Sequence, residues 1–226
     1  REALQLCNLC LAHVQHEFVL WTEILLLKAY TQLLLGDFVG ATESAEDAIT
    51  LDEETPPALI YQGYARLSMI AFQQGQYEHS LQQALRLLDY LQSKGWDDAE
   101  ALIIGYSRTA KALSALHRYD DALRHLHQAE RLCGNLNDDR RFAFVLDSMA
   151  HCYFLQHNLP KAAHTLQRAV SVARSNVRDN EFVALLNNLA LIYCANGQYQ
   201  LSANILVESL SLAQTASPRL YASALS

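Results

Sequence analysis

Hydrophobic, small and turn-forming residues recur along the chain in a fixed pattern. Each copy has a turn residue, an aromatic residue or Leu two positions later, and a small residue five positions after the turn. The residue nine positions after the turn is small or Leu. The turn residues are spaced by 39, 42, 40 and 40 positions, and they are Gly36, Gly75, His117, His157 and Gly197. Five copies at a nearly constant period indicate a repeat architecture.

The small residues predict that each repeat is a pair of helices. A small residue also stands seven positions before each turn, at Ala29, Ser68, Ala110, Ala150 and Ala190. Small residues on both sides of a turn allow two helices to approach closely, and Gly at the turn accepts the left-handed backbone that ends a helix. Each hairpin leaves an apolar face that must be covered by a neighbour. We therefore expect an all-α fold without β-strands, a right-handed superhelical solenoid of antiparallel helix hairpins.

The pattern also gives expected boundaries. Residues 1–226 are expected to form a single repeat domain. Its expected parts are an orphan second helix at 1–15, hairpins at 17–50, 58–92, 98–132, 139–174 and 180–214, and a truncated first helix at 218–226. Acidic or amide pairs stand 41 residues apart where first helices should begin, at Asp97-Asp98, Asp138-Asp139 and Asp179-Asn180. Such short side chains accept the free N–H groups of a first helical turn. Pro56, Pro57, Pro160 and Pro218 all fall in expected loops or first turns, where Pro is tolerated.

The order small–Tyr–Gly–Tyr–Ala–Ala resembles the tetratricopeptide repeat (TPR), over residues 1 to about 214, and the segment from Leu186 to Tyr193 matches it best. The chain departs from the usual unit of about 34 residues and lacks its early Trp. The longer unit is similar to the repeats of kinesin light chains and of bacterial regulators, such as maltose-type activators and peptide-sensing repeat regulators. The resemblance implies a non-catalytic protein- or peptide-binding scaffold in a larger cytoplasmic, bacterial protein of signalling or transcription regulation. The alternative that it allows is a small-molecule sensor domain of a maltose-activator type.

Both ends of the chain look like interrupted repeats. Ala3 corresponds to Ala41 of the next repeat, so the first residues match a second helix. Ser217-Pro218-Arg219-Leu220 matches the start of another first helix. We therefore expect flanking repeats or an effector domain, and self-association through the truncated ends is a further possibility.

Composition and charge narrow the function classes. Hydrophobic residues make up 51% of the chain, which argues against disorder. Residues 1–100 carry 5 Lys/Arg against 15 Asp/Glu (−10), and residues 101–226 carry 12 against 9 (+3). Neither half has the dense basic face of a nucleic-acid binder, and no apolar run approaches the ~20 residues of a membrane span. Five cysteines, an odd number without framework spacing, indicate a reducing compartment, with the cytoplasm expected.

One motif resembles a metal site, namely Cys7-x2-Cys10-x2-His13-x2-His16. On a helix each step of three residues rotates by about 300°, so these ligands drift around the axis. We instead expect Cys7 and Cys10 to occupy the packing positions that Ala45 and Ala48 hold in the next repeat. No catalytic or phosphate-binding motif is present, so neither an enzyme nor a cofactor is expected.

The candidate site is a polar stripe along the first helices of the hairpins. In a TPR-like stack these helices line a concave groove, and polar residues on apolar helices need exposure or a partner. The candidate residues are Gln62, Arg66, Met69 and Phe72, then Ser107, Arg108 and Lys111, then Asp147, Ser148 and His151, then Asn187, Asn188 and Leu191. Arg and Lys would hold an acidic group of a protein or peptide partner, and the Asn amides would hold its backbone. The alternative is that these residues merely solvate an open groove.

Overall fold

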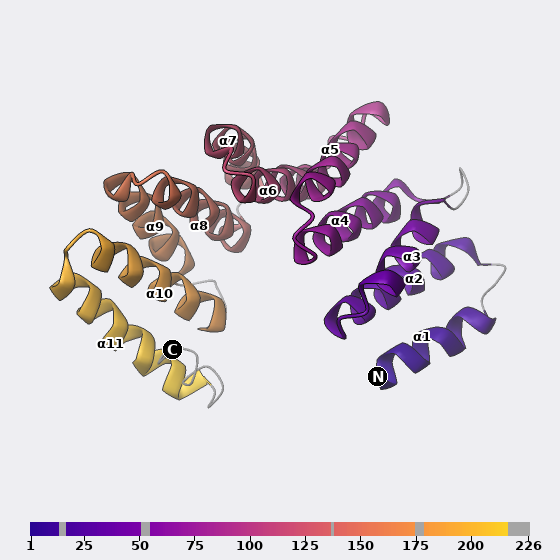
Figure 1. Ribbon diagram of the computed structural model, residues 1–226, viewed down its shortest axis with the longest axis horizontal. Coiled ribbons are helices and arrows are strands. Elements are labelled where there is room, and N and C mark those ends of the chain that lie inside the picture. Colours follow the sequence, from indigo (N-terminus) through magenta and orange to yellow (C-terminus); the bar gives the residue numbers. More distant parts are fainter. Residues whose placement is uncertain (14–16, 51–54, 137, 175–178, 217–226) are drawn as a thin grey trace. The chain divides into compact units, whose positions relative to one another are not determined.

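The computed structural model describes residues 1–13, 17–50, 55–136, 138–174 and 179–216, and over these residues the chain forms eleven α-helices and no strand (Figure 1). The helices are α1 (Glu2–His13), α2 (Phe18–Leu34), α3 (Phe38–Thr50), α4 (Pro57–Gln73), α5 (Tyr77–Ser93), α6 (Ala99–Ala115), α7 (Tyr119–Leu136), α8 (Asp139–Leu155), α9 (Leu159–Ala173), α10 (Asp179–Ala195) and α11 (Tyr199–Ala216). The all-α hairpin fold predicted from the repeats is confirmed. None of the described helices is long and apolar enough to cross a membrane. The truncated helix expected at 218–226 lies outside the described residues.

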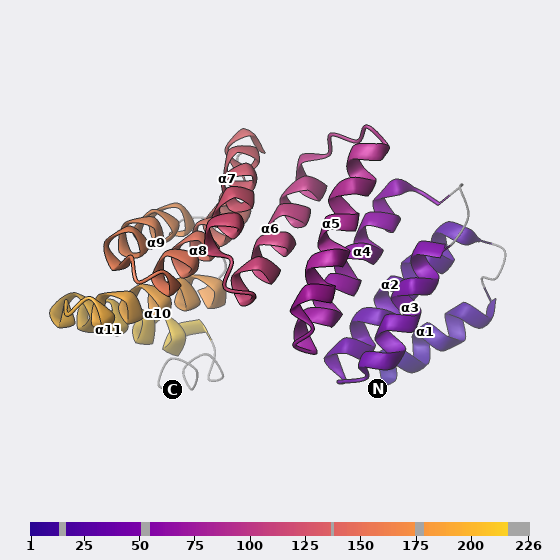
Figure 2. The ribbon, with the colours of Figure 1, turned by 45° about the horizontal axis from the view of Figure 1, so that its top comes forward.

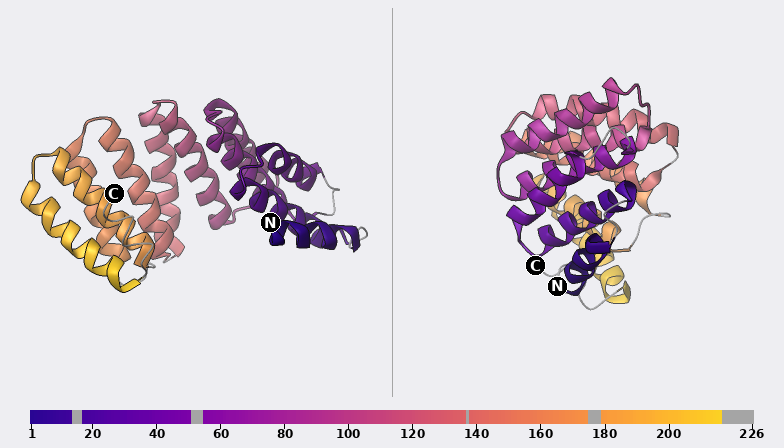
Figure 3. Two further views of the ribbon diagram at one scale, coloured as in Figure 1. Left: turned by 60° about the horizontal axis from the view of Figure 1, so that its bottom comes forward. Right: turned by 90° about the vertical axis from the view of Figure 1, so that its right-hand side faces the viewer.

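The chain divides into two compact units, Arg1–His117 and Arg118–Ser226. In the first unit α1 to α6 pack consecutively (Figure 2), and among the first helices α2 contacts α4 and α4 contacts α6. In the second unit α7 to α11 pack in the same consecutive order (Figure 3). The single domain predicted for residues 1–226 stays a prediction.

The small residues of the repeat lie where the two helices of a hairpin meet. Ala29 of α2 and Ala41 of α3 are fully buried, as are Ala150 of α8 and Ala162 of α9. Where Ser replaces Ala, its hydroxyl is satisfied within the hairpin. Ser80 Oγ donates to the carbonyl of Ser68 at 2.8 Å, so the polar atom costs little when it is buried.

The turns and helix starts follow the expected chemistry. His117 and His157 adopt positive φ angles of 59° and 58°, the same left-handed backbone that Gly adopts at the other turns. Asp98 accepts hydrogen bonds from the N–H groups of Glu100 and Ala101, and it thereby caps α6. Asp138 likewise accepts from the N–H of Arg141 at the start of α8.

Two glycines mark close contacts between neighbouring hairpins of the first unit. A Cβ atom at Gly63 of α4 would lie 2.2 Å from Cγ2 of Ile49 on α3. At Gly105 of α6 it would lie 2.6 Å from Cδ2 of Leu88 on α5. In both places the first helix of one hairpin presses its backbone against the second helix of the preceding one.

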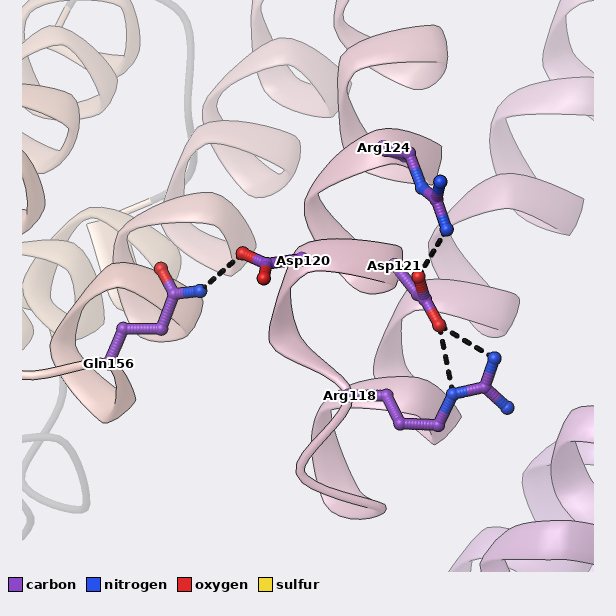
Figure 4. A network of polar contacts seen from close by, with 5 residues as sticks. All are labelled: Arg118, Asp120, Asp121, Arg124 and Gln156. Atoms are coloured by element: carbon purple, nitrogen blue, oxygen red, sulfur yellow. Dashed lines mark hydrogen bonds and ion pairs between the residues drawn. The ribbon is translucent and has the colours of Figure 1, made fainter.

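Polar contacts link alternate helices of the second unit. Arg140 of α8 pairs with Glu181 of α10 at 2.6 Å, Arg168 of α9 with Glu130 of α7 at 2.9 Å, and Arg174 with Glu208 of α11 at 2.7 Å. Figure 4 shows that Gln156 donates to Asp120 of α7, while Asp121 pairs with both Arg118 and Arg124. Such exposed pairs contribute little stability each.

Candidate functional site

Two cationic residues occupy equivalent positions on neighbouring first helices of the first unit. Arg66 of α4 stands nine residues before the turn at Gly75, and Arg108 of α6 stands nine residues before the turn at His117. Because α4 and α6 are in contact, the repeat places these two guanidinium groups on the same side of the unit. Lys111 follows Arg108 by three residues and shares its helix face. We call Arg66, Arg108 and Lys111 the basic strip.

Each member of the basic strip lies against the first helix before its own. The guanidinium carbon of Arg66 is 4.4 Å from the ring centroid of Tyr30 on α2. Nζ of Lys111 is 4.5 Å from the ring centroid of Phe72 on α4. Cations over aromatic rings gain modest stabilisation when desolvated, and the rings hold both side chains in place.

The basic strip has no acidic counterpart in the part of the chain that the structure describes. Arg108 instead donates to the sulfur of Met69, which is a weak acceptor, at 3.6 Å. Burial lowers the pKa of Arg108, and the positive charge of Arg66 lowers it further. Burial likewise lowers the pKa of Lys111, with Arg108 adding to the effect, and burial lowers the pKa of Arg66. Arg66 and Arg108 are half-buried and Lys111 is exposed, so the strip is a run of positive charges that repel one another, and its two guanidinium groups are partly desolvated.

Two further predicted residues lie near the strip in sequence. Ser107 precedes Arg108 on α6, and its buried hydroxyl makes no hydrogen bond with the described residues. Gln62 of α4 is half-buried, about one turn before Arg66. Tyr30 was not predicted, although it stands six residues before the turn at Gly36, as Met69 stands before Gly75. The equivalent position of Met69 in the next repeat was the sequence signal that could have identified Tyr30.

The other predicted site residues lie in the second unit, on the first helices α8 and α10. Asp147 of α8 accepts a hydrogen bond from Nδ2 of Asn188 on α10 at 2.9 Å. Burial raises the pKa of Asp147, while the Asn188 hydrogen bond and the nearby His151 oppose the rise. His151 itself is exposed, one turn after Asp147. The structure therefore joins Asp147 and Asn188 across neighbouring first helices.

Asn187 and Ser148 are occupied within their own surroundings. Asn187 accepts a hydrogen bond from Oγ of the fully buried Ser209 on α11 at 2.6 Å, so its side chain is turned toward the second helix of its own hairpin. Ser148 donates to the carbonyl of Phe144, one turn earlier on α8. The expected ladder from Arg108 to Asn188 combines residues of both units, and its continuity stays a prediction.

Two large apolar side chains stand on the exposed surface of the same helices. Phe144 is 58% exposed and lies three residues before Asp147, and Leu191 is 59% exposed and lies three residues after Asn188. Leu191 was among the predicted residues, whereas Phe144 was not. Phe144 lies three residues before Asp147 and four before Ser148, and this helical spacing was the signal that could have identified it.

The N-terminal cysteine motif divides between the core and the surface. Cys7 is buried, whereas Cys10 is exposed, so the packing role predicted for Cys10 is wrong. Leu11, four residues after Cys7, takes the buried position instead, because α1 turns the face of Cys7 and Leu11 toward the core. No group of three or more His, Cys, Asp or Glu residues is placed to hold a metal ion among the residues described, a set that excludes His16.

Comparisons with known proteins identify the fold. Neither a protein-family model nor a curated protein matches the sequence. Among solved structures, BtubC (BKLC) from P. vanneervenii aligns with a TM-score of 0.79 and 15% identity, covering 93% of this chain and 87% of that one. A kinesin light chain of Podosopora anserina with nearly identical TPR-like repeats aligns with a TM-score of 0.67 and 18% identity, covering 83% and 92%.

A Rap protein complexed with Competence and Sporulation Factor aligns with a TM-score of 0.76 and 15% identity, covering 88% of this chain and 56% of the Rap protein. Identities this low concern the backbone arrangement and not the ligand. Together with the helix order and the buried small residues at each hairpin, these structural alignments establish that this chain has the TPR-like repeat fold.

Proposed function

We propose that this chain is a non-catalytic module that binds a protein or peptide partner through the basic strip, within a larger cytoplasmic signalling or regulatory protein. The observation that carries the proposal is that Arg66, Arg108 and Lys111 form no ion pair with any residue that the structure describes. Partly buried charges without counter-charges cost stability, so the presence of Arg66 and Arg108 at equivalent repeat positions needs a reason. An acidic group on the partner supplies that reason.

The geometry suits a carboxylate or another anion carried by a peptide. Guanidinium groups present several N–H donors in a fixed plane, which matches the two oxygens of a carboxylate. Tyr30 and Phe72 hold Arg66 and Lys111 from one side, which lowers the entropy lost when an anion binds.

Proteins of the same fold support a binding role. One Rap structure is a complex with Competence and Sporulation Factor, and a STAND protein from Pyrococcus horikoshii carries a tetratricopeptide repeat sensor. The Cut9 structure is a hetero-tetramer with Hcn1. Because these proteins of the same fold bind partners or act as sensors, a binding module is the first function to test for this chain.

The test begins with selection of binding sequences from a random peptide library displayed against the whole chain. We expect the selected sequences to be enriched in Asp or Glu. Calorimetric titration of a selected acidic peptide should then show that Arg108→Ala weakens binding about tenfold or more, because a hydrogen bond to a charged group is lost. Arg86→Ala is the matched control, since Arg86 is an exposed arginine on the second helix α5 of the same unit.

Equal losses in Arg108→Ala and Arg86→Ala would contradict the proposal, as would a library that yields no binding sequence. A free small anion that binds the chain with higher affinity than any selected peptide, and that needs Arg108, would favour the small-molecule sensor instead.

A further inference from the structure

In the second unit a carboxylate lies one position before the repeat position that Arg66 and Arg108 occupy in the first unit. Asp147 stands ten residues before the turn at His157, on the first helix α8, and it reaches Asn188 of the next first helix. Asp147 is thus a charge of opposite sign to Arg66 and Arg108 at a neighbouring repeat position. This contrast raises the question of what Asp147 would bind.

The arginines that form ion pairs in the second unit pair with carboxylates other than Asp147. Arg118 and Arg124 pair with Asp121, Arg140 pairs with Glu181, and Arg168 pairs with Glu130. Arg141 pairs with Asp138, and Arg174 pairs with Glu208. Asp147 accepts a hydrogen bond from the neutral amide of Asn188. Its other neighbour is His151, an exposed residue on the same helix. No Lys or Arg among the described residues forms an ion pair with it.

The free acceptors of this pair have a definite chemistry. Oδ1 of Asp147 accepts from Nδ2 of Asn188, which leaves Oδ2 of Asp147 and Oδ1 of Asn188 without a hydrogen bond among the described residues. Two oxygen acceptors on neighbouring helices, one of them anionic, match a donor-rich cation. A guanidinium or ammonium group donates to both, whereas an anion or an apolar group cannot.

The apolar residues beside the pair suit the rest of a basic side chain. Phe144 lies one turn before Asp147 on α8, and Leu191 lies one turn after Asn188 on α10, each with more than half of its surface exposed. The aliphatic stem of Arg or Lys packs on such residues while its charged head reaches the carboxylate. An aromatic ring beside the site also favours a cation.

From these observations we infer that Asp147 and Asn188 form a binding site for an Arg or Lys side chain of a peptide partner. The inference rests on the proposed peptide-binding function and extends it, because it assigns the recognition of a basic residue to side chains of the second unit that are not part of the basic strip. The partner it describes carries both an acidic and a basic side chain.

The same random peptide library tests this inference, now with two versions of the chain. Sequences selected on the parent chain should be enriched in Arg or Lys as well as in Asp or Glu. Sequences selected on Asp147→Asn should keep the acidic enrichment and lose the basic one. Asp120→Asn is the matched control, because Asp120 is an exposed carboxylate of the same unit whose partner is Gln156 on the loop after α8 (Figure 4).

A double-mutant cycle then isolates the contact. In a selected peptide the Arg is replaced by citrulline, which has nearly the same shape and no charge. Fluorescence anisotropy should show that this change weakens binding to the parent chain about tenfold or more and leaves binding to Asp147→Asn unchanged. A thermal melt of Asp147→Asn should show intact folding, since the variant keeps the shape of the side chain.

The possible results separate the two proposals. If the citrulline peptide loses as much affinity for Asp147→Asn as for the parent, or if basic enrichment survives in Asp147→Asn, the Asp147 site is overturned while the basic strip stands. Basic residues absent from the parent's selected sequences overturn it in the same way. A library that yields no binding sequence overturns both.

Discussion

Arg108 donates to the sulfur of Met69 at 3.6 Å, and these residues belong to neighbouring first helices, 39 positions apart in the chain. A thioether is one of the weakest acceptors in a protein, whereas a guanidinium is among the strongest donors. The pairing leaves most of the hydrogen-bonding capacity of Arg108 unused, in surroundings where burial already disfavours its charge. The proposed function accounts for this arrangement, because an acidic partner would use that hydrogen-bonding capacity.

Arg108→Met should separate function from stability. Removing a desolvated charge next to Arg66 relieves repulsion, and Met can pack on Met69, so the free energy of unfolding should stay the same or rise by up to about 1 kcal/mol. Affinity for an acidic peptide should fall at the same time. Urea unfolding and calorimetric titration of the variant measure the two effects, and a clear loss of stability would show that Arg108 serves the core.

The pKa of Lys111 predicts a pH dependence. Burial, with a further contribution from Arg108, lowers this pKa below its ordinary value of 10.5, so the unfolded chain keeps a proton at pH values where the folded chain has released it. The free energy of unfolding should therefore receive a contribution from Lys111 that increases with pH across the interval ending at 10.5. Binding of an acidic peptide should weaken over the same interval, because the ammonium charge is lost.

Lys111→Gln supplies the control for that measurement, since it lacks the titrating group. Urea unfolding and peptide titration are compared for the parent and the variant at several pH values up to about 10. Identical pH profiles for the two chains would show that Lys111 contributes neither effect.

The left-handed backbone at His157 predicts a stabilising substitution. A non-glycine residue at a φ of 58° is strained, and Gly removes that strain at some cost in unfolded-state entropy. We expect His157→Gly to raise the free energy of unfolding by about 0.5–1 kcal/mol. Gly197→Ala, at the equivalent turn with a φ of 73°, should have the opposite effect. Thermal melts that show the same sign for both variants would contradict this explanation.

The buried contact at Ala162 predicts a destabilising one. Its side chain is fully buried between α8 and α9, so Ala162→Leu should cost about 1–3 kcal/mol through overpacking. Ala184→Leu is the matched control, because Ala184 is exposed on α10. Ala184→Leu should leave the thermal midpoint nearly unchanged, and an unchanged midpoint for Ala162→Leu would refute the alignment of the repeats.

The repeats were predictable because they depend on local rules. Ala41 and Ala162 had to be small for two helices to meet. The position of His157 was recognisable as a turn because it stands where other repeats have Gly. The site was predictable only as a stripe, since helix periodicity places Arg108 and Lys111 on one face. The pairing of Asn188 with Asp147 depends on rotamers chosen across residues about 40 positions apart, which no local pattern encodes.

Cys10 shows where the repeat analogy fails. A residue aligned with Ala48 is buried only if a neighbouring helix covers that face. In α3 the neighbours α2 and α4 cover Ala48, whereas α1 packs on α2 and leaves Cys10 exposed. Sequence alignment between repeats transfers the position of a residue, but it does not transfer the neighbour.

The ion pairs Glu130–Arg168, Arg140–Glu181 and Arg174–Glu208 have a consequence for the order of the hairpins. The small residues at the hairpin contacts are alike in successive repeats, so they do not distinguish one neighbour from another. The charges do distinguish neighbours, because each of these arginines meets a glutamate in the observed order. Exchanging the hairpin α8–α9 with the hairpin α10–α11 would break these pairs, so together they favour the observed order of hairpins, by the small free energy that exposed ion pairs contribute.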